Sequence, residues 1–344
     1  MDIIVQKLDT MVFNGRATYK EIMLNLQLPA DQIHSMHIAL FIPNGRNGTA
    51  PVFVAPNACG NHTITEYDGV SVIEQPWQRN SCAKKYARRG SRADFWAVAN
   101  TISRGYALVT FCIADMDPDR HDWTDGIHAK YPYAPEGEDT QWGTLAAWAW
   151  GMQRVIDYLE TDANIDQDRI CVTGWSRRGK AALFAAAMDE RIDLVVPHQS
   201  GTGGMALSRM DPEESVARIN QSFPHWFNDN FTRFDTAVSR LPIDQHLLIA
   251  LVAPRPLLDC AGLQDTWASP HLALEAMKAA TPVYDLLGVS GIVGQGFVVD
   301  VIDDVEMGRL LQVQRDTGHI LNIDYWNTII DFADRQLSKP VRRY

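Results

Sequence analysis

The stretch VTGWSRRGKAALFAAA, residues 172–187, carries most of the information about the fold. An apolar β-branched run precedes Ser176 and an alanine-rich run follows it. This order predicts a buried strand, a sharp turn at the serine and a helix that begins near Arg177. The familiar nucleophile pattern is G-x-S-x-G. Here Gly174 fits the pattern, but the next glycine, Gly179, comes one place late. Ser176 is therefore either a nucleophile raised above a sheet or a residue that caps the helix.

Apolar strands and amphipathic helices alternate over most of the chain beyond this stretch, from about residue 101 onward. Such alternation is typical of an α/β fold with a mainly parallel sheet covered by helices on both faces. Reactive groups of such sheets lie on loops at the carboxyl ends of the strands. The expected strands are YALVTFCIAD (106–115), RICVTGWS (169–176), IDLVVPHQSG (192–201) and RPLLDCAGLQD (255–265), and the expected helices are QWGTLAAWAWGMQRVIDYLETD (141–162), GKAALFAAAMD (179–189), HLALEAMKAAT (271–281) and YWNTIIDFADRQL (325–337).

Three sections depart from this alternation. Residues 1–56 consist of short apolar runs broken by Gly, Pro and Asn, which predicts an antiparallel strand section. Residues 57–100 look irregular and contain the basic stretch CAKKYARRGSR (82–92). Residues 202–246 are rich in polar and aromatic residues and predict a loop-helix region inserted over the edge of the sheet. Since α/β folds of 344 residues often form one domain, we expect a single catalytic domain over residues 1–344.

The composition excludes several classes of protein. With 46% hydrophobic and 21% charged residues, the chain has an ordinary globular balance and can bury a large core. A formal net charge of −11 argues against a general nucleic-acid binder, which needs a basic face. No apolar run reaches the length of a transmembrane helix, and the N-terminus lacks the basic and apolar regions of a signal peptide. We therefore expect neither a nucleic-acid partner nor membrane association.

The cysteines and other possible ligands do not indicate a metal site. The five cysteines are scattered without a C-x-x-C pair, so neither a zinc motif nor a redox motif is present. Cys112, Cys171 and Cys260 lie in apolar runs, which predicts that they are buried. A Cys59–Cys82 disulfide is possible, but the sequence does not decide it. No cluster of His, Asp and Glu suggests metal ligands, and we expect no cofactor.

A catalytic serine of this architecture needs an acid and then a histidine later in the chain. His319, in QRDTGHILN (314–322), follows a short expected strand and precedes the last helix, so it fits the catalytic base; the alternative is a hydrogen-bonded loop histidine. Asp265, in GLQDTWASP (262–270), follows a strand and precedes a helix, so it fits the acid; the alternative is a capping residue. A second place for the acid, at the end of the strand after the serine, holds Gln199, whose amide cannot stabilise an imidazolium by charge.

These residues resemble the glucuronoyl esterase family, carbohydrate esterase family 15, and most closely its bacterial branch. The resemblance is strong over about residues 100–335 and weak in the N-terminal part. The element G-x-S-R-x-G-K is more specific than a bare G-x-S-x-G and accounts for the late glycine. The other matching stretches are DMDPD (115–119), WGTLAAWAWGMQRVIDYLETDANID (142–166), SGTGGMALSR (200–209), FPHWFNDNF (223–231), LPIDQHLLIALVAPRPL (241–257), DTWASP (265–270) and GHILNIDYW (318–326).

The resemblance implies an α/β-hydrolase fold, a three-layer sandwich, and hydrolysis of esters of 4-O-methyl-glucuronic acid, such as those that join glucuronoxylan to lignin alcohols in plant walls. It implies a secreted or periplasmic protein, although the visible chain leaves a cytoplasmic one open, and we expect a monomer whose partner is a glucuronate-containing polysaccharide. Carried over residue by residue, the roles are: nucleophile Ser176, general base His319, oxyanion stabiliser Arg177, sugar contacts Lys180 and Glu214, and sugar-pocket wall Trp267.

The chain departs from the family pattern at two positions. Many members carry a glutamate as the acid where this chain has Gln199, so the acid falls to Asp265, at a place that other members use. A second polar sugar contact, eight places after Glu214, would fall on Ser222. Two other functions stay open at this point. One is an esterase acting on acetylxylan or another carbohydrate ester, and the other is a carbohydrate-binding protein on an inactive hydrolase scaffold.

Overall fold

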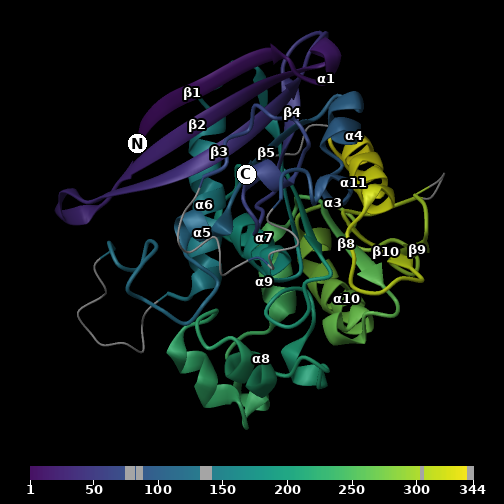
Figure 1. Ribbon diagram of the computed structural model, residues 1–344. Helices are drawn as coiled ribbons and strands as arrows, with labels where there is room; N and C mark the ends of the chain where they lie inside the picture. Colours follow the sequence, from purple (N-terminus) through teal and green to yellow (C-terminus); the bar gives the residue numbers. More distant parts are fainter. Residues whose placement is uncertain (74–81, 83–87, 132–141, 303–305, 339–344) are drawn as a thin grey trace. The chain divides into compact units, whose positions relative to one another are not determined.

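The computed structural model describes residues 1–73, 82, 88–131, 142–302 and 306–338 (Figure 1). The chain divides into two compact units, residues 1–170 and 171–344. A single catalytic domain over the whole chain stays a prediction. Every residue for which a role was predicted from sequence lies in the second unit.

The first unit contains an antiparallel strand section, as predicted for residues 1–56. Its strands are β1 (Asp2–Met11), β2 (Ala17–Gln27), β3 (Ile33–Pro43), β4 (Ala50–Val54) and β5 (Ala107–Phe111), in the order β1-β2-β3-β5-β4. β1, β2 and β3 pair antiparallel. The prediction was wrong for β4, which pairs parallel with β5. The chain between β4 and β5 is long enough for the crossover that a parallel pair requires.

The helices of the first unit are mostly short. They are α1 (Val12–Gly15), α3 (Ala93–Trp96), α4 (Val98–Ser103), α5 (Ile113–Met116) and α6 (Thr144–Leu159), with single turns η1 (Pro29–Asp31) and η2 (Asn61–Thr63). α6 confirms the long helix expected there. A disulfide joins Cys59 to Cys82, which decides the pairing that the sequence left open. Residues 83–87 of the basic stretch lie outside the described residues.

The second unit contains a series of parallel strands. β6 (Ile165–Trp175) begins at the end of the first unit, and β7 (Leu194–His198), β8 (Leu257–Gly262), β10 (Leu310–Arg315) and β9 (Phe297–Val299) follow in that order across the sheet, all parallel. Every residue of β7 and β8 is buried. Strands buried on both faces need continuous apolar runs, which is why the sequence pattern located them.

Four helices accompany these strands: α7 (Arg177–Met188), α9 (Gln245–Val252), α10 (Pro270–Leu286) and α11 (Ile323–Gln336). α7 packs on β7, and α9 packs between α7 and α10 (Figure 1). The helices at α7, α10 and α11 confirm the sequence prediction, whereas α9 and the short strand β9 were not predicted. Cys112, Cys171 and Cys260 are buried as expected. No helix among the described residues is long and apolar enough to cross a membrane.

The section between β7 and α9 consists of loops and short helices, namely η5 (Ser208–Met210), α8 (Val216–Ser222), η6 (Asp229–Phe234) and η7 (Val238–Arg240). Asp244, at the end of this section, forms hydrogen bonds with residues near its beginning. One carboxylate oxygen accepts from the Ser208 N–H at 2.9 Å and the other from the Arg209 N–H at 3.0 Å, while Asp244 also caps α9. The part of this section between Arg209 and Asp244 is therefore closed by hydrogen bonds at its two ends.

Candidate active site

Ser176 lies at the sharp turn between β6 and α7. Its backbone adopts φ 61° and ψ −130°, a conformation that L-residues rarely occupy and that costs about 1–3 kcal/mol. The Ser176 N–H donates to the His198 carbonyl at 2.9 Å, which fixes the turn to the end of β7. The Ser176 side chain makes no capping hydrogen bond to α7, so the capping alternative is wrong. A strained strand-to-helix turn is the geometry that exposes a nucleophilic hydroxyl.

The late glycine of this turn has a steric reason. A Cβ atom on Gly174 would lie 2.2 Å from the Arg178 carbonyl oxygen. A Cβ atom on Gly179 would lie 2.8 Å from the Gly174 carbonyl oxygen and 3.1 Å from the backbone of Pro197. The first turn of α7 therefore presses directly on the ends of β6 and β7. The second glycine is needed where the helix meets the strand, and in this chain that point is Gly179.

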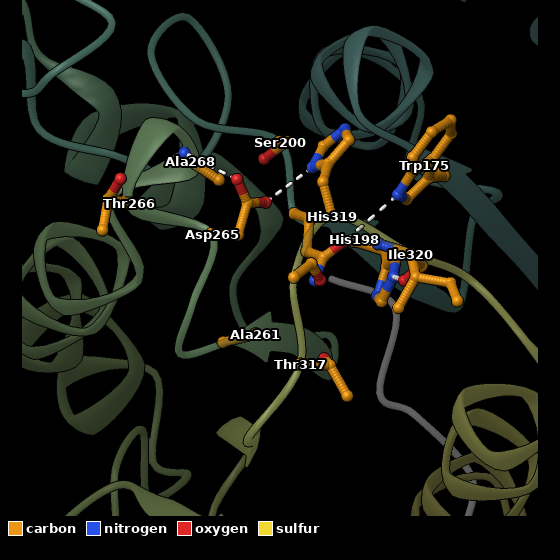
Figure 2. A network of polar contacts seen from close by, with 12 residues as sticks. Trp175, His198, Ser200, Ala261, Asp265, Thr266, Ala268, Thr317, His319 and Ile320 are labelled. Atoms are coloured by element: carbon orange, nitrogen blue, oxygen red, sulfur yellow. Dashed lines mark hydrogen bonds and ion pairs between the residues drawn. The ribbon is translucent and has the colours of Figure 1, made fainter.

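His319 and Asp265 form a hydrogen-bonded pair (Figure 2). The His319 Nδ1 lies 2.6 Å from the Asp265 Oδ2. Asp265 follows β8 and is buried, and its second carboxylate oxygen accepts from the Ala268 N–H at 3.4 Å. The His319 side chain, on the loop between β10 and α11, is about one third exposed. With Nδ1 donating to the carboxylate, Nε2 is the nitrogen that can accept a proton.

The indole of Trp175 places this pair beside the serine. Its ring centroid lies 4.4 Å from that of His319. Because Trp175 directly precedes Ser176, the imidazole stands next to the nucleophile turn. In the described part of the chain, no hydrogen bond joins the Ser176 hydroxyl to His319. Such contacts are often long without substrate and tighten when it binds.

Two aromatic side chains from the 202–246 section hold Arg177. Its guanidinium carbon lies 4.8 Å from the ring centroid of Phe223 and 4.6 Å from that of Trp226. The two rings stack with centroids 3.7 Å apart, and Trp226 is buried. Cation–π contact of this kind restrains a guanidinium without neutralising it. Neither aromatic was singled out from the sequence, although both lie in the FPHWF run of the family resemblance.

Lys180 and Glu214 contact each other and are both buried, at 3% exposure. The Lys180 Nζ lies 2.7 Å from the Glu214 Oε2, and it also donates to the carbonyls of Ser200 at 2.6 Å and Thr202 at 2.5 Å. These contacts use all three ammonium protons. Burial lowers the pKa of Lys180, while the Glu214 carboxylate acts in the opposite direction. Contact of these two residues with a sugar stays a prediction, and it would require this arrangement to open.

Breaking the Lys180–Glu214 pair is expected to destabilise the fold. In the variant Lys180→Met, the Glu214 carboxylate stays buried and, within the described part of the chain, keeps the Thr202 N–H, 3.1 Å away, as its one hydrogen-bond donor. We expect the free energy of unfolding, measured by urea denaturation, to fall by about 3–5 kcal/mol. The double variant Lys180→Met/Glu214→Gln should recover part of this loss because it removes the uncompensated charge. A Lys180→Met variant as stable as the wild type would contradict this assignment.

The other predicted site residues lie at different depths. Trp267, two places after Asp265, is 38% exposed, so part of its ring faces solvent. Ser222 lies at the exposed C-terminal end of α8. Gln199 is buried. Its side chain forms hydrogen bonds with backbone groups on either side of His319 and with the indole of Trp175, but not with the imidazole of His319. The described residues contain no group of three or more His, Cys, Asp or Glu side chains that could hold a metal ion.

His198, the last residue of β7, also contacts the loop that carries His319. It is fully buried, and its Nε2 donates to the Ile320 carbonyl at 2.8 Å. Burial lowers the pKa of His198 to about 3. The ring therefore stays neutral and serves as a fixed donor to the loop that carries His319.

The low pKa of His198 predicts acid sensitivity. In the unfolded chain a histidine has a pKa of about 6.5, so the unfolded chain binds the proton more readily than the folded protein does. The contribution of neutral His198 to the free energy of unfolding is therefore complete above about pH 6.5. It is lost as the pH falls toward about 3, by up to about 1.4 kcal/mol per pH unit. His198→Gln keeps a donor near the Nε2 position but does not titrate, so its unfolding free energy should fall less steeply with acid. The exposed His271→Gln serves as the control, and equal slopes for His198→Gln and the wild type would contradict this reading.

Comparison with known proteins gives a consistent picture. The family described as "Glucuronyl esterase, fungi" matches residues 98–288. The curated "Carbohydrate esterase MZ0003", from an unknown prokaryotic organism, is 36% identical over 340 residues, which cover 94% of this chain and 76% of that protein. "4-O-methyl-glucuronoyl methylesterase 1" of Wolfiporia cocos (strain MD-104) is 41% identical over 162 residues, which cover 44% of this chain and 40% of that protein.

A solved structure also matches nearly the whole chain. The structure titled "Glucuronoyl Esterase from Solibacter usitatus" superposes with a TM-score of 0.86 at 32% identity, over 97% of this chain and 86% of that one. The predicted α/β-hydrolase fold is thereby confirmed. A carbohydrate esterase matches 94% of this chain, and a glucuronoyl esterase shares its fold. The chain therefore belongs to the glucuronoyl esterase family, carbohydrate esterase family 15, and is a carboxylic ester hydrolase.

Proposed function

We propose that this enzyme hydrolyses esters of glucuronic acid and 4-O-methyl-glucuronic acid, such as the esters that join glucuronoxylan to lignin alcohols. The observation that carries the proposal is the 2.6 Å contact between His319 Nδ1 and Asp265 Oδ2, set beside the strained turn at Ser176. The substrate class is supported by the glucuronyl esterase family match and by the fungal relative named as a 4-O-methyl-glucuronoyl methylesterase.

The reaction follows from the geometry of the three residues. The Ser176 hydroxyl attacks the ester carbonyl carbon, and its proton passes to His319 Nε2. The carbonyl π electrons move to oxygen, which gives a tetrahedral oxyanion. When this intermediate collapses, the bond to the alcohol oxygen breaks and His319 returns the proton to that oxygen. Water then repeats the sequence on the acyl-serine, releasing the free uronate and restoring Ser176.

We place the oxyanion at the N-terminus of α7, because the first N–H groups of a helix point toward its N-terminal end and attract negative charge. Arg177 is the first residue of this helix, and its guanidinium is restrained by Phe223 and Trp226. We assign both the N–H and the guanidinium of Arg177 to the oxyanion, because a charge-assisted donor adds to the backbone site. Loss of one such donor typically raises the barrier by about 2.7–4 kcal/mol.

The sugar ring of a uronate ester is polar on its edges and flatter on its faces. The exposed ring of Trp267 offers an apolar wall beside the acid Asp265. Ser222, exposed at the end of α8, offers a hydroxyl. Lys180 and Glu214 are the proposed partners of the ring hydroxyls once substrate reorganises their mutual contact.

Initial rates on two glucuronate esters and on acetylated xylan test the proposal. The wild-type enzyme should release benzyl alcohol from benzyl glucuronate and methanol from methyl glucuronate, with little release of acetate from acetylated xylan. Release of acetate alone would assign the enzyme to acetylated carbohydrates instead. An enzyme that binds glucuronoxylan but turns over neither ester would be a carbohydrate-binding protein on an inactive scaffold.

We also propose that the protein works as a monomer outside the cytosol, either secreted or periplasmic. The Cys59–Cys82 disulfide supports an oxidising compartment. Peptide mapping of the protein purified from its source without reductant should recover the Cys59–Cys82 cross-linked pair, and sedimentation of the 344-residue chain should give a single species of 38.6 kDa. Recovery of both cysteines as free thiols, or a dimer mass, would contradict the respective part of this proposal.

A further inference from the structure

Gln199 binds the loop of the general base on both sides of His319. Its side-chain Nε2 donates to the Gly318 carbonyl at 2.9 Å, and its Oε1 accepts from the Ile320 N–H at 2.9 Å. The same Oε1 accepts from the Trp175 indole Nε1 at 3.1 Å. One amide therefore bridges the two peptide groups that flank His319 and the aromatic ring that packs on the imidazole.

The neighbouring residue extends this contact. His198 Nε2 donates to the Ile320 carbonyl at 2.8 Å, so the His198–Gln199 pair bonds three backbone groups of residues 318–320. Figure 2 shows Trp175, His198 and Ile320 gathered beside His319. The strand β7 thus holds the loop after β10 by hydrogen bonds that cross the sheet, while Asp265 holds the imidazole from its other side.

The backbone around Gln199 is shaped to admit its amide. Gln199 is 4% exposed, and its φ of 46° is unusual for a residue other than glycine. At the end of β8, a Cβ atom on Gly262 would lie 2.4 Å from the Gln199 Nε2 and 2.6 Å from the carbonyl oxygens of both Thr317 and Gly318. Only a glycine at position 262 leaves room for the amide and the loop to meet.

The two groups that Gln199 contacts have opposite hydrogen-bonding character. The Gly318 carbonyl needs a donor, whereas the Ile320 N–H needs an acceptor. An amide supplies both at once, and an ionised carboxylate supplies only acceptors. A glutamate at position 199 would place a negative oxygen against the Gly318 carbonyl oxygen, and a buried unpaired acceptor of that kind is unfavourable.

We propose that Gln199 is a positioning residue for the general base: its amide fixes the backbone on both sides of His319 and so sets the imidazole between Ser176 and Asp265. The proposal rests on the proposed function, because it takes His319 as the base of the ester hydrolysis. It gives Gln199 a task other than that of an acid. The charge is supplied by Asp265 alone, and Gln199 supplies geometry.

The first test removes the amide without changing the size of the side chain. Gln199→Met should lower kcat for benzyl glucuronate by about 10- to 100-fold, because small displacements of a catalytic group cost this much. KM should change by no more than about twofold, since Gln199 is buried and its amide already bonds protein groups. A Gln199→Met enzyme with the kcat of the wild type would overturn the proposal.

The second test uses Gln199→Glu and compares its kcat with that of the wild type from about pH 5 to about pH 8. A protonated carboxyl has one donor and one acceptor and mimics the amide, whereas the ionised form does not. The ratio of kcat values, variant to wild type, should therefore fall as the pH rises. A ratio that rises with pH would mean that the introduced carboxylate serves as a second acid, and a ratio that stays at one would mean that the amide positions nothing.

A matched control separates positioning from general stability. Gln336 is also a buried amide of the second unit; its Nε2 donates to the Gly308 carbonyl at 2.9 Å and its Oε1 accepts from Arg309 at 2.8 Å, with no contact to residues 318–320. Gln336→Met should lower the melting temperature and leave kcat unchanged. Equal losses of kcat in Gln199→Met and Gln336→Met would overturn the positioning role.

The same variants are also compared by the rate at which a fluorophosphonate labels Ser176, a reaction that needs the base but no sugar. Slower labelling in Gln199→Met with normal labelling in Gln336→Met supports the proposal even if glucuronate esters prove not to be the substrate. Absence of wild-type activity on benzyl glucuronate, together with rapid labelling, refutes the proposed substrate alone. Equal labelling of Gln199→Met and the wild type refutes the role of Gln199.

Discussion

Replacing Asp265 by asparagine is expected to lower kcat on benzyl glucuronate by about 10⁴-fold, the cost seen when a catalytic histidine loses its carboxylate partner. The Asp265 Oδ2 accepts the His319 Nδ1 proton at 2.6 Å and is buried. An asparagine amide at that place either presents its NH₂ group to Nδ1, which favours the wrong tautomer, or its oxygen, which carries no full charge. In neither case is the imidazolium stabilised. Steady-state kinetics at several pH values measure this loss.

Asp259 provides the matched control for this substitution. It lies on β8, six residues before Asp265, is buried, and accepts from the Gln312 Nε2 at 2.8 Å. Burial raises the pKa of Asp259 to about 7. Asp259→Asn keeps an acceptor for Gln312, so its kcat should remain within about threefold of the wild type. If Asp259→Asn lost as much activity as Asp265→Asn, a shared structural effect would explain both.

Replacing Ser176 by alanine is expected to lower kcat by at least about 10⁴-fold and to leave substrate binding intact. The change removes the atom that forms the acyl-enzyme, while the fold keeps the same backbone turn. Ser176 makes no capping bond to α7, so its hydroxyl does not stabilise the helix. The melting temperature should therefore stay close to that of the wild type. Calorimetric titration with glucuronic acid checks that the sugar site is unchanged.

Residual activity of Ser176→Ala close to that of the wild type would show that another group attacks the ester. The control for loss of a hydroxyl near the turn is Thr173→Val on β6, whose Oγ1 donates only to the Val196 carbonyl at 3.1 Å. This variant should be somewhat less stable and fully active. The contrast isolates the nucleophile from the hydrogen bonds that support it.

The parts of the fold that the sequence predicted are those with a simple periodic cause. β7 and β8 are buried on both faces, so they read as continuous apolar runs. The strand-to-helix turn was located by Gly174 and Ser176, and its late glycine is explained by the close approach of α7 to the strand ends. Asp265 and His319 were found from their places after strands, and the structure brings their side chains together.

The parts that the sequence did not predict depend on contacts between distant segments. β9 is three residues long, too short to give a period. β4 was expected to be antiparallel. The expectation failed because its partner β5 comes more than fifty residues later, and the local pattern of residues does not show that pairing. The roles of His198 and Gln199 arise from backbone groups of residues 318–320, which carry no sequence signal. Likewise, Lys180 is held by two carbonyls that no residue type indicates.

The most direct test of this account asks which position supplies the acid. The kcat on benzyl glucuronate is measured for the wild type, Asp265→Asn and the double variant Asp265→Asn/Gln199→Glu under identical conditions. Both variants are expected to stay at least about 10³-fold below the wild type, because Asp265 provides the charge and the amide of Gln199 provides the geometry. A kcat of the double variant within about tenfold of the wild type would contradict the assignment of the acid to Asp265, since a carboxylate at position 199 would then replace that of Asp265.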